Sequence, residues 1–255
     1  MKNRVDTLPV DFEARTAAGA LRLSVVIPTL NEAARIGRLV EHLRRHADAR
    51  LEDILVVDAD SADGTASVAD LAGARVIRSD TRCRAAQMNL GARMAGGNVL
   101  YFVHADALPP ASFLDAIERA LAQGRPMGCF RMAFDTAHPL LRVNAYCTRF
   151  DLPFCRGGDQ TLFVTASLFE ATGGYDEAHV IMEEYDWLRR ARERAPFAIL
   201  PETVTVSARK YRDASYLRVN LANACVYTLY AMGISTPRLR RLYRRLLHRY
   251  RSGAT

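Results

Sequence analysis

Four segments in the first half of the chain place polar and acidic residues just after a run of apolar residues. These segments are "PTLNE" (28–32), "DADSADGT" (58–65), "SDTRCRAAQMN" (79–89) and "HADALPP" (104–110). Asp58 ends one apolar run, where its carboxylate could accept hydrogen bonds from a nucleoside base or ribose. The alternative for this acidic turn is structural, because carboxylates also stabilise the N-terminus of a following helix.

The segment 104–110 is the candidate metal site. Mg²⁺ and Mn²⁺ take oxygen ligands, typically one or two protein carboxylates together with phosphate oxygens and water. Asp106 fits this role, because Pro109 and Pro110 stiffen the chain that follows it. His104 is a second candidate ligand, although Mg²⁺ disfavours imidazole and a purely structural histidine is an equal alternative.

Elements that would position these residues follow from the apolar pattern. Apolar runs at 21–28, 52–58, 74–79 and 98–104 predict buried strands, and helices are expected between them, the first over 32–46 with Asn31 as its N-cap. Strands that alternate with helices predict a parallel sheet covered on both faces. Ligands of such sheets bind beyond the carboxyl ends of the strands, so the four polar segments should meet at one edge.

The pattern is looser after Pro110. We expect a helix over 111–123, strands at 127–134 and 160–165, a helix around 183–193, and two helices within 214–251. The predicted organisation is a flexible N-terminal arm (1–21), an α/β domain (22–212) and a C-terminal helical extension (213–255). Within the domain, 22–108 would form a nucleotide-binding half and 109–212 an acceptor half.

Two common phosphate-binding motifs are missing from the sequence. There is no G-x-G-x-x-G after the first strand and no G-x-x-x-x-G-K-[ST] anywhere, which disfavours dinucleotide-binding and P-loop proteins. A nucleotide would therefore need another phosphate anchor, most simply Mn²⁺ or Mg²⁺.

Taken in order, the motifs resemble those of family 2 glycosyltransferases with the GT-A fold. The similarity runs from "IPTLNE" and "VVDADSADGT" through "RAAQMNLGARMAGGNVLYFVHAD" to "GGYDE" and "MEEYDWLRRA", and so covers residues 22 to about 212. The sequence looks most like a bacterial subgroup with HAD in place of D-x-D. The resemblance implies a GT-A, Rossmann-like, mixed but mostly parallel sheet flanked by helices. It also implies that Asp106 holds the metal and that the nucleotide is bound by Pro28, Thr29, Glu32, Asp58 or Asp60, and Arg84.

The resemblance also implies a general base in an acidic pair that opens a late helix. The pair here is Glu183-Glu184, whereas the family usually has Glu-Asp, and alignment favours Glu184 as the base. Without the resemblance, both acids would be explained as residues that stabilise the N-terminus of a helix through its dipole. Arg209 and Lys210 could stabilise the departing diphosphate. An equal alternative is that both are solvent-exposed surface residues without a role in the reaction. Gly158, Asp159 and Gln160 are candidates for the acceptor side, where amide and carboxylate groups could bond sugar hydroxyls.

The chain is 255 residues long with a net charge of +7, and the excess positive charge is confined to one segment. Residues 238–251 hold seven arginines and no acid, and the 35 basic residues less these seven equal the 28 acidic ones. A nucleic-acid-binding protein usually spreads its basic charge over the fold, so nucleic acid is not an expected partner. Five cysteines without a C-x-x-C pair, and an N-terminus without a signal-like apolar stretch, predict a cytoplasmic location.

The arginine-rich segment has two explanations. It could form a basic amphipathic helix that lies on anionic lipid at the inner face of the membrane and brings the enzyme to a lipid-linked acceptor. Alternatively, the C-terminal helices pack on the domain or on a second subunit of a homodimer, with the arginines solvated. The apolar stretch 216–234 contains Arg218, Asn220 and Asn223, which makes it a marginal membrane span.

The function expected from the sequence is inverting transfer of a sugar from a nucleotide-diphosphate sugar, with a UDP-sugar favoured, to an unidentified hydroxyl acceptor. A sugar-phosphate nucleotidyltransferase is one rival, but "PTLNEAARIG" lacks the Gly-rich basic loop that usually follows the first strand of those enzymes. A non-catalytic nucleotide-sugar-binding module is the other, because both acidic motifs depart from the family pattern.

Overall fold

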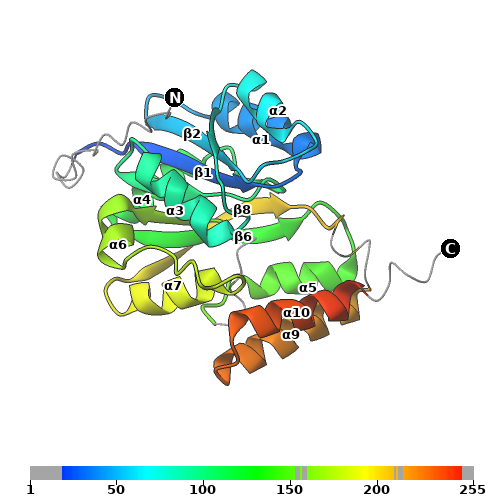
Figure 1. The fold of residues 1–255 in the computed structure, drawn as a ribbon. Helices are drawn as coiled ribbons and strands as arrows, with labels where there is room; N and C mark the ends of the chain where they lie inside the picture. Colours follow the sequence, from blue (N-terminus) through cyan, green and yellow to red (C-terminus); the bar gives the residue numbers. More distant parts are fainter. Residues whose placement is uncertain (1–18, 153–155, 157–159, 210, 212–214, 249–255) are drawn as a thin grey trace.

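The computed structural model describes residues 19–248 except 153–155, 157–159, 210 and 212–214. Most of the predicted N-terminal arm therefore lies outside the described residues. The described chain forms one eight-stranded sheet with helices on both faces (Figure 1). The strands are β1 (Leu23–Thr29), β2 (Leu51–Asp58), β3 (Arg75–Arg78), β4 (Val99–Phe102), β5 (Ala107–Leu108), β6 (Met127–Phe134), β7 (Leu162–Thr165) and β8 (Phe197–Val206). The helices are α1 (Ala33–Arg45), α2 (Thr65–Leu71), α3 (Arg84–Met94), α4 (Phe113–Ala122), α5 (Pro139–Cys147), α6 (Ala166–Ala171), α7 (Glu183–Arg192), α9 (Tyr216–Ala231) and α10 (Thr236–His248).

The sheet is mixed and mostly parallel, as the sequence predicts. Its order is β3-β2-β1-β4-β7-β6-β8-β5, with β3, β2, β1 and β4 paired in parallel. Strand β7 runs antiparallel between β4 and β6, and β5 runs antiparallel to β8 at the edge. Backbone pairing thus continues without a break from the first half of the domain into the second.

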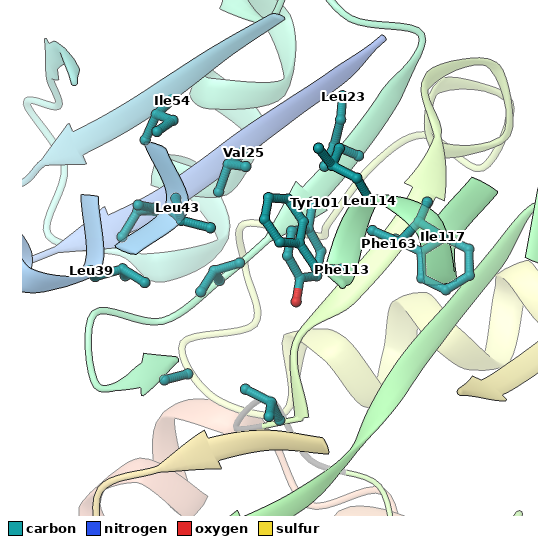
Figure 2. Close-up of a cluster of buried hydrophobic side chains, with 14 of the residues drawn as sticks. Leu23, Val25, Leu39, Leu43, Ile54, Tyr101, Phe113, Leu114, Ile117 and Phe163 are labelled. Atoms are coloured by element: carbon teal, nitrogen blue, oxygen red, sulfur yellow. The ribbon is translucent and has the colours of Figure 1, made fainter. Parts of the chain in front are cut away.

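Two hydrophobic cores, one on each face of the sheet, follow from the alternation of side chains along the strands. On one face Val25, Ile54 and Tyr101 pack against α1 and α4 (Figure 2). On the other face Val26 and Leu100 pack against α3, α6 and α7, where Trp187 is fully buried. Buried strands with apolar residues on both faces are typical of a sheet sandwiched between helices.

The sequence prediction missed β8, and its course explains why. "FAILPETVTV" contains Pro201 and Glu202, which argue against a central strand. The register of β6 with β8 jumps from the pair Phe130–Leu200 to the pair Arg131–Thr203, so the two residues are accommodated in a bulge. Such a bulge depends on the partner strand and cannot be predicted from local composition.

Helix α5 and the short strand β5 were also not predicted. Pro139 occupies the first turn of α5, where the missing N–H of proline costs nothing, in a segment for which the sequence analysis predicted no helix or strand. The C-terminal extension forms two helices, α9 and α10, as predicted. Among the residues that the structure describes, no helix is long and apolar enough to cross a membrane.

Candidate active site

The loop after β2 is built around the carboxylate of Asp58, which is 5% exposed. It accepts hydrogen bonds from Thr29 Oγ1 (2.9 Å), Ser61 N (2.9 Å) and Ser61 Oγ (2.5 Å). These bonds hold the loop 58–61 against the end of β1. Asp58 and Thr29 therefore shape the predicted nucleotide side of the rim, while Pro28 is buried within β1.

The N-terminus of α1 is capped from this loop and not by Asn31, which corrects the sequence prediction. Asp63 Oδ2 accepts from Ala33 N at 3.1 Å, and Thr65 Oγ1 accepts from Glu32 N at 2.8 Å. Asn31 has a positive φ of 56°, and its side-chain oxygen accepts from Ala62 N at 3.0 Å. The acidic turn thus joins two loops of the rim as well as opening α2.

Asp60 lies apart from this buried network. Its side chain is exposed and forms ion pairs with Arg78 at 3.0 Å and Arg82 at 3.8 Å. Asp60 has a φ of 60°, in the left-handed region that aspartate tolerates better than most residues. Of the two alternatives for the nucleotide pocket, Asp58 is the buried organiser and Asp60 the exposed ion-paired residue.

His104 and Asp106 lie in the turn between β4 and β5, because β4 ends at Phe102 and not at His104, where the sequence analysis ended the strand. The turn is fastened at both sides: Val103 N donates to Val26 O, and Ser207 N donates to Asp106 O, each at 3.0 Å. The second of these bonds brings the end of β8 against the turn. As a result, Arg209 Nη2 lies 3.2 Å from Asp106 Oδ2.

Arg209 also connects Asp106 to Glu32 on the opposite side of the rim. Its two terminal nitrogens donate to the two carboxylate oxygens of Glu32, at 2.9 and 2.5 Å. All three side chains are at most 37% exposed. The predicted metal ligand and two predicted nucleotide-binding residues therefore form one cluster, although they are up to 177 residues apart in the chain.

The residues around Asp106 fit a divalent cation that is held mainly by its substrate. Among the described residues, no group of three or more His, Cys, Asp or Glu side chains is arranged as a metal cage. Asp106 offers a hard carboxylate on a fixed turn, and Mg²⁺ or Mn²⁺ commonly binds one or two carboxylates plus phosphate oxygens. The donor set is too small for a resident structural metal and suitable for one that arrives with a diphosphate.

The acidic pair opens α7, where both acids face the favourable end of the helix dipole. Met182 precedes them with a φ of 66°, which turns the chain sharply into the helix. Glu184 Oε1 lies 3.3 Å from His104 Nε2. The structure therefore brings the predicted base, the HAD turn and the predicted metal ligand together.

Glu183 has a different environment. It is 4% exposed, and its Oε1 lies 3.5 Å from Nε of Arg84, the predicted nucleotide-side arginine. Burial raises the pKa of Glu183, Arg84 opposes that shift, and the neighbouring Glu184 adds to it. A carboxyl group closed off in this way holds Arg84 and the start of α7, whereas Glu184 is the more accessible of the pair.

Glu184 and Gln160 line the same small cavity, between β7 and α7. Gln160 is 3% exposed; its Oε1 accepts from Arg156 Nη1 at 3.2 Å, and its Nε2 has no hydrogen-bond partner among the described residues. A buried amide donor without a partner is costly, so it marks a place where a ligand oxygen would be stabilised. The other two acceptor candidates, Gly158 and Asp159, lie outside the described residues, as does Lys210.

Arg156 is a site residue that the sequence analysis missed. Its guanidinium is buried and donates to the carbonyls of Thr148 and Phe150 as well as to Gln160. These bonds tie the segment after α5 to the cavity. The only signal in the sequence is a single arginine before "GGDQ", which nothing distinguishes from a surface arginine until its partners are known.

Comparisons with known proteins show the family and the fold. The family model for glycosyl transferase family 2 matches residues 24–167, which is more than half of the chain. A comparison with curated proteins gave no match.

Several solved structures share the fold. A mannosyltransferase from Pyrobaculum calidifontis, in complex with GDP-Man and Mn²⁺, is 18% identical with a TM-score of 0.63 over 92% of this chain and 76% of that one. Glucosyl-3-phosphoglycerate synthase from Mycobacterium tuberculosis, with Mn²⁺, UDP and glucosyl-3-phosphoglycerate, is 18% identical with a TM-score of 0.56 over 88% and 85%. S. aureus TarS is 13% identical with a TM-score of 0.63 over 92% and 73%. The fold is therefore that of GT-A glycosyltransferases, and the chain belongs to glycosyl transferase family 2.

Proposed function

We propose that the chain is an inverting glycosyltransferase that moves a sugar from a nucleotide-diphosphate donor to an acceptor hydroxyl, with Glu184 as the general base. One observation supports this most directly. Glu184 is 3.3 Å from His104, two residues before the candidate metal ligand, and it also lines the cavity with Gln160. A direct displacement requires a base within reach of the acceptor hydroxyl, and lining the acceptor cavity close to the metal site meets that requirement.

The donor would lie along the rim from Asp58 to Asp106. A divalent cation bound at Asp106 would offset negative charge on the diphosphate, as Mn²⁺ does in metal-assisted displacements. Arg209, which already contacts Asp106, would add positive charge at the same place. A UDP-sugar with Mn²⁺ or Mg²⁺ is the favoured donor, because the mycobacterial synthase with the same fold binds UDP with either ion.

The acceptor would enter at the cavity that Gln160 and Glu184 line. Glu184 takes the proton of the acceptor hydroxyl. At the same time the oxygen of that hydroxyl attacks the anomeric carbon from the face opposite the diphosphate. The bond between that carbon and the diphosphate oxygen breaks, and its electron pair leaves with the nucleoside diphosphate. A single displacement inverts the anomeric configuration.

Turnover of UDP-sugars by Glu184→Gln tests this assignment. We expect release of UDP in the presence of Mn²⁺ to fall by about 10²–10⁴-fold, which is the usual contribution of a general base. UDP binding, followed by thermal shift, should be retained, since Glu184 does not lie on the nucleotide side. Glu193→Gln, at the exposed C-terminal end of the same helix, is the matched control and should keep its activity.

Two results would contradict the proposal. An unchanged rate in Glu184→Gln, with Glu183→Gln inactive but still folded, would assign the base to Glu183. Release of pyrophosphate from a sugar phosphate and a nucleoside triphosphate, with no transfer from UDP-sugars, would favour a nucleotidyltransferase.

A further inference from the structure

Helix α9 carries large apolar side chains on its exposed side as well as on its buried side, together with the exposed Asn223 and Thr228. Its inner side buries Val219, Ala222 and Val226. Its outer side exposes Leu217 (66%) and Leu221 (69%), followed by Ala224 and Cys225, with Met232 (71%) just after the helix. A surface helix normally turns polar residues toward water, so the outer side of α9 has the composition of a surface that is covered.

Helix α5 lies beside α9 and has the same property. Asn144 Nδ2 donates to Asn220 Oδ1 at 3.0 Å, and the hydroxyl of Tyr216 donates to Asn144 Oδ1 at 2.8 Å. The outer side of α5 exposes Leu140, Val143 and Tyr146. Eight of the eleven large hydrophobic side chains exposed among the described residues belong to 140–152 or 217–232. We call the exposed apolar residues of α5 and α9 the apolar face.

Helix α10, which packs on α9, adds positive charge to this group of helices. Its apolar side packs on α9: Leu239 is fully buried, and the hydroxyl of Tyr243 donates to Asn223 at 3.0 Å. The side away from α9 exposes four arginines, Arg238, Arg241, Arg244 and Arg245. From residue 214 to the end, the chain has eight arginines and no aspartate or glutamate.

We infer that α5, α9 and α10 form a docking surface for an anionic phospholipid membrane. Exposed apolar and aromatic side chains on two helices, with exposed arginines on the helix packed against them, suit a lipid interface, where the former enter the acyl boundary and the latter contact phosphate groups. The structure also changes the mode of contact expected from the sequence. Because α10 uses its apolar side against α9, it contributes charge, and α5 and α9 contribute the inserting residues.

A second copy of the chain is a poorer occupant of this surface. A two-fold symmetric dimer would place the same face on both sides of the interface. The arginines of α10 would then be brought into the interface without a counter-charge, because α5, α9 and α10 contain no acidic residue that could pair with them. An anionic membrane supplies the opposite charge. The inference rests on the arrangement of these helices and does not depend on the proposed function.

Sedimentation of the full chain with lipid vesicles tests the inference. We expect binding to vesicles of phosphatidylcholine mixed with phosphatidylglycerol, no binding to phosphatidylcholine alone, and weaker binding as salt is raised. Arg241→Gln/Arg245→Gln should reduce the partition coefficient about 25-fold, since each basic residue near an anionic surface contributes about fivefold. Leu217→Ser/Leu221→Ser should reduce it at least about tenfold through lost apolar burial.

Matched variants on the other side of the molecule are the controls. Arg38→Gln/Arg45→Gln on α1 removes the same charge from exposed positions, and Leu71→Ser/Met94→Ser removes exposed apolar groups from α2 and α3. Both should bind vesicles like the unmodified chain, and all variants should keep its melting temperature. The inference fails if the mixed vesicles are not bound, or if the control variants lose as much binding as the test variants. It also fails if the unmodified chain is a dimer that does not bind vesicles, and Leu217→Ser/Leu221→Ser converts that dimer to monomers.

Discussion

At the scale of single residues, the rim is organised by carboxylates that each face a basic group. Glu32 and Asp106 share Arg209, Glu183 faces Arg84, and Glu184 faces His104. These pairs join segments that lie far apart in the sequence. The negative charge of the site is thereby balanced before a donor binds, and a diphosphate would bring its own negative charge next to Arg209.

Asp106→Asn should abolish cation binding at the rim while leaving the other side chains of the rim unchanged. The variant keeps the size of the side chain and the backbone bond from Ser207, but it loses the hard carboxylate oxygens that a divalent cation prefers. In the unmodified chain, UDP with Mn²⁺ at about 100 times Kd should stabilise the fold by about 2.7 kcal/mol, and the variant should lose most of that gain. Thermal shifts with UDP, with and without Mn²⁺, measure it.

Asp70→Asn, on an exposed position of α2, is the control for that substitution and should behave like the unmodified chain. If Asp106→Asn kept the same Mn²⁺ dependence of UDP binding and turnover, the cation would have to be placed elsewhere. The readout by thermal shift does not require an active enzyme. It therefore tests the cation site separately from the identity of the base.

Glu183 should make stability depend on pH. Its pKa in the folded chain is raised above the usual 4.5 by burial, so the folded state holds more protons than the unfolded state above that pH. Stability associated with this group is present below 4.5 and is lost as the pH rises through the folded pKa. Glu183→Gln cannot ionise, so its stability relative to the unmodified chain should improve with rising pH. Urea unfolding at about pH 4, 6 and 8 measures this difference.

An exposed carboxyl on α1 offers the control. Glu41→Gln makes the same chemical change at a side chain that is exposed to water. A difference between Glu183→Gln and the unmodified chain that did not vary with pH would mean that the pKa of Glu183 is the same in the folded and unfolded chains.

The residues that the sequence identified differ in how well their roles could be predicted. The position of Asp106 beyond a strand and of Glu184 at a helix start follows from local pattern, and the structure places both at the rim. The carboxylate of Asp58 accepts hydrogen bonds from Thr29 and Ser61, and these bonds depend on contacts between two loops. The burial of Arg156 depends on carbonyls that only the folded chain brings together. Local pattern locates functional groups, whereas tertiary contacts decide which of them face a ligand.

At the scale of elements, α3 is held close to the sheet by a glycine. A Cβ at Gly91 would lie 2.4 Å from Val26 Cγ1 and 3.1 Å from Val57 Cγ2, both on buried strands. The close approach sets the depth of α3, whose first residue is Arg84 at the rim. The helical pattern of 84–95 was predictable, but its distance from the sheet was not, because that distance depends on side chains of β1 and β2.

Gly91→Ala should therefore destabilise the fold by about 1–3 kcal/mol through overpacking. Alanine is favoured over glycine in a helix by about 1 kcal/mol. The measured loss of stability is therefore the cost of the steric clash less this gain in helix propensity. Gly37→Ala in α1 is the matched comparison, because its new Cβ would meet only Val68 Cγ1 at 3.1 Å. Urea unfolding should rank Gly91→Ala below Gly37→Ala, and equal stabilities would show that β1 yields to the extra methyl group.

At the scale of the whole molecule, the two halves are joined by strand pairing and by side chains across the rim. β4 pairs with β7, and β5 pairs with β8, so the last strands close onto the turn that holds Asp106. Arg209 then reaches back to Glu32 at the start of α1. The mostly parallel first half was predictable from its alternation of strands and helices. The order of the later strands was not, because β7 inserts between β4 and β6 and no local pattern encodes such pairing.

The pair of Arg209 and Glu32 should couple the halves energetically. A double-mutant cycle with Glu32→Gln and Arg209→Gln, followed by urea unfolding, should give a coupling energy of about 1 kcal/mol, because the pair is two-pronged and partly shielded from water. Arg22 and Glu52 form a similarly two-pronged pair, with Arg22 56% exposed, and that pair should give a smaller coupling. If the cycle of Arg209 and Glu32 gave a coupling energy near zero, strand pairing alone would hold the halves together. Arg209 would then be free to leave Glu32 for an arriving diphosphate at little cost to the fold.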